Sequence, residues 1–225
     1  MPDSPARRTP RRTPTHQPVL DALLAELAAA DATLAETAIE RRILYRGRYI
    51  TFETDRIVRG DGVESTRDLV IHPGAVAILP LDAEGRLLCV RQFRIAAGGA
   101  MLEIPAGTLD VSAEGVVEEP EVAAHRELEE ETGYRAGSME RLGGFWSAPG
   151  FSTEYLTLFL ATDLRPAHEN RLGPDEDERL ELTPIDWRDA VAAVEAGLVE
   201  DAKSVAGILW LARRLEGHGG KVDGD

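Results

Sequence analysis

Residues 125–134 read HRELEEETGY, and this stretch does most to decide the fold and to direct the search for a function. It holds four glutamates within five positions: Glu127, Glu129, Glu130 and Glu131. On a helix, like charges three or four residues apart repel each other and destabilise it slightly. Either solvent or a bound cation must offset that repulsion.

A helix is expected around this stretch. Pro120 suits the first helical position, and acidic residues flank it where the helix dipole is positive. Gly133 suits a left-handed residue just after the last turn. Glu127, Glu130 and Glu131 are then three and four positions apart and can project to one side. Clustered carboxylate oxygens suit hard dications such as Mg2+ or Mn2+, whereas a solvated acidic face is the plainer alternative.

Strands are expected on both sides of this helix. Segments rich in Ile, Val, Tyr, Phe and Thr precede it at residues 42–58, 68–82, 86–95 and 100–110. Further strands are expected at 139–148, 155–164 and 179–187, and two closing helices at 187–198 and 201–216. This order predicts an α/β fold, an α/β/α sandwich around a mixed β-sheet.

Length and composition narrow the classes of protein. The 225 residues suit one domain with extensions or at most two small ones. A net charge of −15 argues against nucleic-acid binding through a basic surface. The single cysteine, Cys89, excludes an internal disulfide framework and favours a reducing, cytoplasmic location. No apolar run reaches the roughly 18 residues of a transmembrane helix, so no membrane partner is expected.

The glutamate stretch resembles the second half of the Nudix hydrolase signature, which reads Arg-Glu, apolar, any, Glu-Glu, any, Gly, apolar. Seven positions match it: Arg126, Glu127, Leu128, Glu130, Glu131, Gly133 and Tyr134. Glu118 matches an earlier glutamate of the signature, and Gly107 resembles its opening glycine. The family places that glycine six residues before the glutamate, but eleven separate them here. Five extra residues therefore lie within residues 110–118.

The flanking segments resemble the ADP-ribose pyrophosphatases of that superfamily. These segments are LEIPAG, RQFR, SAPGFSTE and the acidic PDEDE loop, within a resemblance that extends from about Ile43 to Leu215. Pro149 lies sixteen residues past Gly133, as in that group. The resemblance implies hydrolysis of ADP-ribose to AMP and ribose 5-phosphate. The alternatives are another nucleoside diphosphate sugar or a dinucleotide as substrate, and a non-catalytic nucleotide-binding module.

The resemblance also implies roles for the residues of the signature. Glu127, Glu130, Glu131 and the backbone carbonyl of Ala106 are expected to hold the metal ions, Mg2+ or alternatively Mn2+. Glu130 and Arg126 are expected to be catalytic as well, since Arg126 can orient a helix glutamate through a charge-assisted hydrogen bond.

A general base is needed near the attacking water. In similar enzymes it comes from an acidic loop that follows the signature. Glu178 is the expected base, and Glu176 and Asp177 are the alternatives. A solvated loop without a catalytic role is the plainer interpretation.

Substrate contacts are expected from several segments. Arginines such as those of RQFR can hold phosphate or ribose, and the loop APGFSTE offers amides and hydroxyls to the distal sugar phosphate. The resemblance also implies a homodimer, whose second subunit supplies residues to the adenine. The expected substrate-binding residues are Arg91, Arg94, Glu103, Pro149, Gly150, Ser152, Tyr45 and Arg48.

The N-terminal part is expected to be an extension. An Ala- and Leu-rich helix is expected from Val19 to about Glu40. The apolar and aromatic strands around residues 45–52 have an edge that invites pairing with a second subunit. The expected division is a disordered basic tail at 1–18, this helix with dimerising strands at 19–65, the Nudix hydrolase domain at 66–217 and a frayed tail at 218–225.

Overall fold

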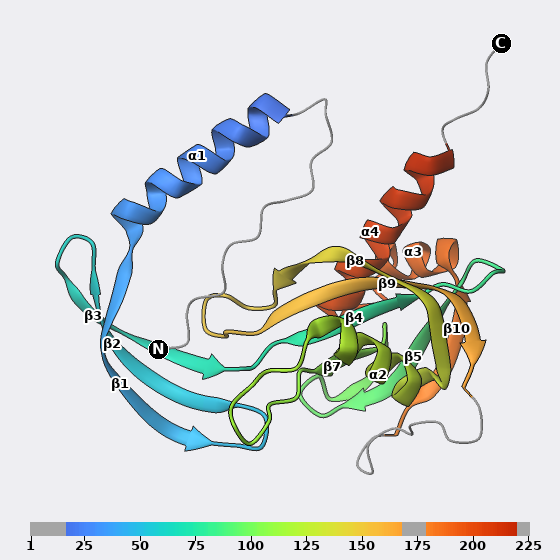
Figure 1. Ribbon diagram of the computed structural model, residues 1–225, viewed down its shortest axis with the longest axis horizontal. Coiled ribbons are helices and arrows are strands. Elements are labelled where there is room, and N and C mark those ends of the chain that lie inside the picture. Colours follow the sequence, from blue (N-terminus) through green and yellow to red (C-terminus); the bar gives the residue numbers. More distant parts are fainter. Residues whose placement is uncertain (1–16, 168–178, 220–225) are drawn as a thin grey trace. The chain divides into compact units, whose positions relative to one another are not determined.

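The computed structural model describes residues 17–167 and 179–219, and the chain forms two compact units, Met1–Val70 and Ile71–Asp225 (Figure 1). The boundary expected after residue 65 falls inside strand β3 (Glu64–Ile71). Helix α1 begins at Gln17 and α4 ends at Gly219, and the other residues of the two expected tails lie outside the described ranges. Within the described ranges, no helix is long and apolar enough to cross a membrane.

The described part of the N-terminal unit consists of helix α1 (Gln17–Leu34) and a sheet of order β1-β2-β3, with β1 at Glu36–Arg46 and β2 at Thr51–Arg59. The prediction of a helix to Glu40 was wrong, because β1 begins at Glu36 and pairs antiparallel with β2. Thr37 and Ile39 are β-branched and favour a strand, and the ladder outweighs the helix propensity of the segment. All residues of β1 are exposed, and β1 is an edge strand.

In its described residues, the C-terminal unit holds two sheets and three helices (Figure 1). One sheet has the order β7-β4-β9-β8 and the other β10-β5-β6. The strands are β4 (Ala75–Pro80), β5 (Arg86–Arg94), β6 (Gly99–Glu103), β7 (Ala106–Thr108), β8 (Tyr134–Trp146), β9 (Tyr155–Pro166) and β10 (Glu181–Asp186). The helices are α2 (Pro120–Thr132), α3 (Trp187–Glu195) and α4 (Ala202–Gly219). Strand β4 runs parallel to β9 and antiparallel to β7, which confirms a mixed sheet.

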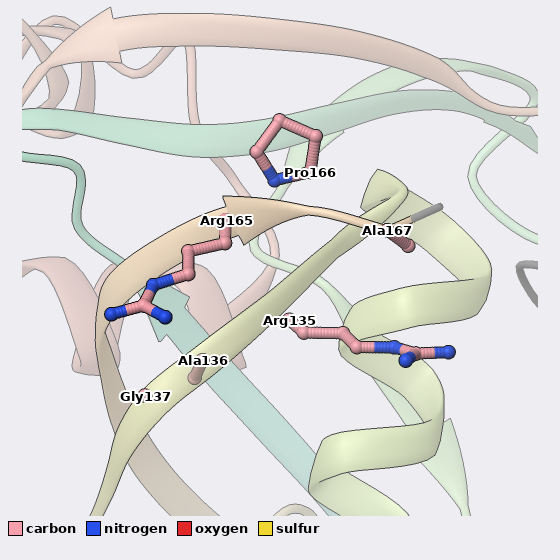
Figure 2. A pocket seen from close by; sticks show the side chains of 6 residues that line it. All are labelled: Arg135, Ala136, Gly137, Arg165, Pro166 and Ala167. Carbon is pink, nitrogen blue, oxygen red and sulfur yellow. The ribbon is translucent and has the colours of Figure 1, made fainter. Parts of the chain in front are cut away.

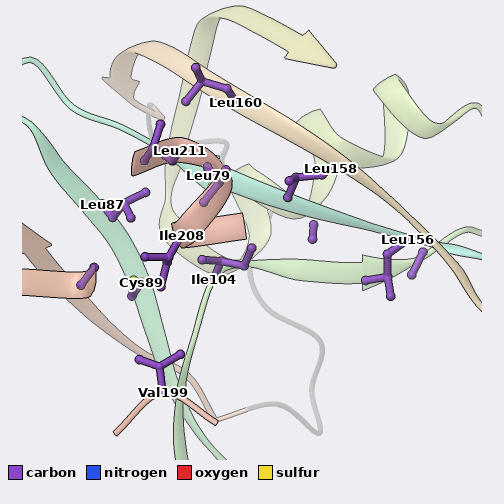
Figure 3. Close-up of a cluster of buried hydrophobic side chains, with 13 residues drawn as sticks. Leu79, Leu87, Cys89, Ile104, Leu156, Leu158, Leu160, Val199, Ile208 and Leu211 are labelled. Atoms are coloured by element: carbon purple, nitrogen blue, oxygen red, sulfur yellow. The ribbon is translucent and has the colours of Figure 1, made fainter. Parts of the chain in front are cut away.

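Strand β4 joins the layers, because it is buried on both faces. Leu79 on one face belongs to a buried cluster with Ile208 and Leu211 of α4 (Figure 3). Ile78 on the other face belongs to a second cluster with Leu128 of α2. Successive residues of a strand point to opposite faces, so one strand contacts a helix layer on each side. The predicted α/β/α sandwich is thereby confirmed.

One expected strand is interrupted. The strand expected over 68–82 ends at Ile71 and resumes at Ala75. Pro73 has no N–H to give to a ladder, and Gly74 adopts a φ of 107° that a larger residue would rarely take. The segment of residues 100–110, expected as a short strand running into a loop, holds β6 and β7, which belong to different sheets. Strand β8 begins at Tyr134 rather than at residue 139.

Candidate active site

Helix α2 begins and ends where its sequence predicts. Pro120 opens it after Glu119. Gly133 follows its last residue with a φ of 73° and donates its N–H to the carbonyl of Glu129 at 2.9 Å. Leu128 is fully buried against the sheet, so the core fixes the frame from which the neighbouring glutamates project.

Arg126 donates hydrogen bonds to three carboxylates, and Asp110 Oδ2 lies 3.9 Å from its Nε. Its Nη1 donates to Glu127 Oε1 at 2.6 Å and to Glu130 Oε2 at 2.9 Å. Its Nη2 donates to Glu118 Oε2 at 2.9 Å and to the carbonyl of Thr108 at 3.2 Å. Burial by itself lowers the pKa of Arg126, but the bonds to Glu118 and the charge of Glu127 raise it well above its ordinary value. The guanidinium therefore stays charged and draws the helix glutamates together.

Glu127 and Glu131 lie close to the backbone of β7. Glu127 is 9% exposed and Glu131 is 8% exposed. Glu131 Oε2 accepts the N–H of Ala106 at 3.2 Å. A Cβ added at Gly107 would lie 1.8 Å from Glu127 Oε1, so a glycine is what leaves room for that carboxylate. The contact seen at Ala106 uses its N–H, and the role expected for its carbonyl stays a prediction.

The five extra residues of the signature are contained in a closed hairpin. An antiparallel bridge joins Val111 to Val117. At the base, the N–H of Glu118 donates to the carbonyl of Asp110 at 2.8 Å, and the N–H of Asp110 donates to Glu118 Oε2 at 3.2 Å. The chain thus returns to its starting point, and Glu118 reaches Arg126 despite the longer loop.

The chemistry of this cluster fits a divalent metal ion. Glu118, Glu127 and Glu130 all accept hydrogen bonds from the guanidinium of Arg126, and Glu131 lies against the same β7 backbone as Glu127. Four carboxylates thus lie around one side of α2 and β7, and carboxylate oxygens are the ligands that hard cations prefer. Among the described residues, these carboxylates do not already converge as a three-ligand cage.

Glu129 is engaged on another side of the helix. Arg135 Nε and Nη2 donate to its two carboxylate oxygens, both at 2.7 Å. Arg135 also borders a pocket of about 280 Å³, in which it extends toward α2 while Arg165 points the other way (Figure 2). The pocket is lined by Arg135, Ala136, Gly137, Arg165, Pro166 and Ala167. None of the expected site residues lines it, so this pocket is distinct from the carboxylate cluster.

Arg91 and Arg94 lie on opposite faces of β5, because the strand is continuous between them. Arg91 Nη2 donates to Glu181 Oε2 on β10 at 2.6 Å. Arg94 Nε and Nη2 donate to the two oxygens of Glu103 at 2.8 and 2.9 Å, a bidentate pair. The hydrogen bonds to Glu103 do most to raise the pKa of Arg94, and the charge of Glu131 adds to them. Arg94 is therefore within electrostatic reach of the carboxylate cluster.

Glu103 is buried, at 2% exposed, and meets a second cation. Lys203 Nζ contacts its Oε2 and lies 2.9 Å from Asp201 Oδ2. Burial raises the pKa of Glu103, but the bond from Arg94 and the charge of Lys203 outweigh burial and hold that pKa below its ordinary value. The ribose contact expected for Glu103 stays a prediction. Sequence reasoning missed Lys203, because a lysine at the start of a helix is more often solvated.

Three expected substrate-binding residues lie on one loop: Pro149, Gly150 and Ser152. The neighbouring Thr153 anchors this loop, since its Oγ1 accepts the N–H of His72 at 2.8 Å and donates to the carbonyl of His72 at 3.1 Å. A Cβ at Gly150 would meet nothing within 4 Å, so the tip of the loop has space around it.

The other expected residues lie elsewhere in the chain. Tyr45 and Arg48 belong to the N-terminal unit, where Tyr45 is 62% exposed and Arg48 lies over the ring of Tyr49, 4.7 Å from its centre. Glu178, the expected base, lies outside the described residues, as do both of its alternatives.

Comparison with known proteins now identifies the family. The NUDIX domain model matches residues 71–205, more than half of the chain, so this chain belongs to the Nudix family. A solved crystal structure of an ADP compounds hydrolase aligns with a TM-score of 0.69, covering 82% of this chain and 96% of that chain at 23% identity. That likeness confirms the Nudix fold.

Curated relatives narrow the class of reaction. The ADP-ribose pyrophosphatase of Bacillus subtilis (strain 168) is 38% identical, over 80% of this chain and 94% of its own length. The methanol dehydrogenase activator of Bacillus methanolicus is 35% identical, over 78% and 92%. The GDP-mannose pyrophosphatase of Cronobacter sakazakii is 32% identical, over 70% and 83%. The protein is a Nudix pyrophosphohydrolase, a class that generally uses divalent metal ions.

Proposed function

We propose that this protein hydrolyses the diphosphate bond of ADP-ribose to give AMP and ribose 5-phosphate, with Mg2+ as its metal and Mn2+ as the alternative. The main support for this proposal is the cluster of carboxylates around Arg126, which lies against β7. The chain is also 38% identical to an ADP-ribose pyrophosphatase. A diphosphate ester needs charge neutralised on both phosphates and a water aimed at one of them.

Glu127, Glu130 and Glu131, with the carbonyl of Ala106, are the residues that would hold the metal. A bound divalent ion supplies charge neutralisation and lowers the pKa of a bound water. Arg126 keeps Glu127 and Glu130 in place before any ligand binds, because it donates to both. This removes a reorganisation step from the reaction.

The remaining roles concern the substrate. Arg94, which Glu103 orients, binds a phosphate group of the substrate. Arg91, on the opposite face of β5, is the second candidate for this role. The loop of residues 147–154 offers amides and hydroxyls to the distal sugar. Tyr45 and Arg48, from the second subunit of the expected homodimer, hold adenine. The homodimer and the cytoplasmic location stay predictions.

Glu178 takes the proton of the attacking water in this proposal. Glu178→Gln is expected to lower kcat by roughly two to four orders of magnitude with little change in KM, because a base acts on the water rather than on the bound substrate. Glu176→Gln and Asp177→Asn are the controls for loss of charge. If Glu178→Gln is as mild as these controls, the base lies elsewhere, and a collapse in Glu176→Gln alone assigns the role to Glu176.

A second nucleoside diphosphate sugar is the competing substrate, because a GDP-mannose pyrophosphatase is also among the relatives. The test is a hydrolysis assay with Mg2+ on ADP-ribose, GDP-mannose, UDP-glucose, NADH and FAD, with the products separated and identified. ADP-ribose is expected to show the highest kcat/KM, by about tenfold or more over GDP-mannose. A higher value for GDP-mannose overturns the substrate assignment, and no cleavage of any diphosphate bond overturns the proposed function.

A further inference from the structure

One edge of the Arg94 guanidinium is hydrogen-bonded, and the other edge, at Nη1, is available to a further acceptor. Nε and Nη2 are both committed to Glu103. Among the described residues, Nη1 has no hydrogen-bond partner. The side chain of Arg94 is 44% exposed, whereas that of Glu103 is 2% exposed. A buried carboxylate thus orients an exposed cation, and the open edge can donate to an anion.

The start of α4 fixes Glu103 in turn. Lys203, which is 9% exposed, contacts the same Oε2 atom of Glu103 that Arg94 Nη2 uses. Lys203 Nζ is itself held at 2.9 Å by Asp201 Oδ2. Ser204 Oγ accepts the N–H of Ile104 at 2.8 Å, which ties the end of β6 to the same helical turn.

Arg94, Glu103, Lys203 and Asp201 form a network of four charged side chains, and its positive and negative charges are equal only when Lys203 is present. Arg94 and Lys203 are two cations, and Glu103 and Asp201 are two carboxylates. Without Lys203, two carboxylates would be left with one guanidinium, and a buried charge without a partner is costly. Arg94 would then be drawn toward both carboxylates as their counterion and would lose its present orientation.

We propose that Lys203 is a positioning residue for substrate binding: through Glu103 it holds the guanidinium of Arg94 with the Nη1 edge open to a phosphate oxygen of the diphosphate substrate. This inference rests on the proposed function, because it requires a substrate with a diphosphate. Lys203 itself touches no substrate in this arrangement, since its ammonium is paired with Glu103 and Asp201.

A double-mutant cycle tests the proposal. Arg94→Gln, Lys203→Met and the double variant are compared with the wild type, using Mg2+ and the best substrate of the hydrolysis assay. Each single variant is expected to raise KM by about tenfold, with kcat within about threefold, because phosphate binding is lost rather than chemistry. Adding Lys203→Met to Arg94→Gln is expected to change KM by less than about twofold, because both act through one guanidinium.

Two controls separate positioning from general loosening. Ser204→Ala removes the tie to Ile104 and the hydrogen bond that Ser204 Oγ donates to Asp201, but it leaves the charges of Arg94, Lys203, Glu103 and Asp201 in place. It is expected to lower Tm but leave KM within about twofold. Lys203→Arg keeps the charge and is expected to restore most of the affinity lost in Lys203→Met. If Lys203→Met does not fold, Lys203→Gln takes its place in the cycle.

The binding of ADP, measured by calorimetry, gives a readout that does not depend on turnover. Its Kd is expected to follow the KM pattern in all four members of the cycle. The proposal would be overturned if Lys203→Met raised KM by the same factor in the wild type and in Arg94→Gln. It would also be overturned if Ser204→Ala raised KM as much as Lys203→Met does. These outcomes are distinct from a failure of the proposed function, in which no diphosphate bond is cleaved but ADP binding can still be measured.

Discussion

Gly107 is the residue at which a missing side chain matters most to the candidate site. Gly107→Ala would place a methyl group 1.8 Å from Glu127 Oε1. The carboxylate is the flexible end of a side chain, so it is expected to move away while the fold survives. A displacement of about 1 Å at a catalytic group can cost on the order of a hundredfold in rate. Steady-state kinetics at saturating Mg2+ should therefore show a loss of about this size.

The matched control for this variant is Gly99→Ala. Gly99 also lies in a strand, and a Cβ there would meet nothing within 4 Å. Its Tm and kcat are expected to match the wild type. If Gly107→Ala keeps wild-type kcat, Glu127 is not required where the structure places it.

At the scale of residues, the sequence predicts where side chains lie on the helix better than it predicts their hydrogen-bond partners. The spacing of Glu127, Glu130 and Glu131 correctly predicts that they share one region of the helix, because helix geometry is fixed. The resemblance predicts that Arg126 orients one helix glutamate, but not that it binds Glu127, Glu130 and also Glu118. Nor does it predict Lys203, because the tertiary packing that buries its ammonium beside Glu103 leaves no local pattern.

At the scale of elements, the hairpin of residues 110–118 shows how an insertion can leave a site intact. Its base is closed by the hydrogen bond from the N–H of Glu118 to the carbonyl of Asp110, 2.8 Å long. Replacing residues 111–117 by Asn-Gly would make this bond the closing bond of a two-residue turn, for which Asn-Gly is well suited. The change removes seven residues and adds two, which restores the spacing expected for the family.

The shortened variant is expected to keep kcat/KM within about threefold of the wild type, because Glu118 stays bound to Arg126. Glu118→Gln in the full-length hairpin is the comparison and should lose more activity, because it weakens a charge-assisted bond. A loss of more than about tenfold on shortening would show that the hairpin itself contributes to catalysis or substrate binding.

Strong local signals predicted the elements of the C-terminal unit well. Helix α2 is a clear case, since proline at its start is a start signal and glycine past its end is a stop signal. Helix α1 was predicted to run too far. The segment after Leu34 has moderate helix propensity, and pairing of β1 with β2, which is a non-local contact, decides its conformation.

At the scale of the whole molecule, the N-terminal unit predicts association with a second copy. Its edge strand β1 is exposed along its length, with Ile43 at 43% and Tyr45 at 62%. Such an edge favours pairing with another strand. Light scattering at micromolar concentration should give twice the chain mass of 24.5 kDa. A fully active protein of monomeric mass would rule out the expected homodimer.

The most direct test of the account is the kcat of Glu131→Gln relative to the wild type, with ADP-ribose and saturating Mg2+. Glu131 is buried and accepts the N–H of Ala106, so the substitution keeps the shape and one acceptor oxygen for that N–H while it removes the charge. With the fold verified by circular dichroism, a loss of at least about a thousandfold, on the order of 4 kcal/mol, is predicted for a lost metal ligand. A variant that keeps more than about a tenth of the wild-type rate would contradict the assignment of the α2 glutamates as the metal site.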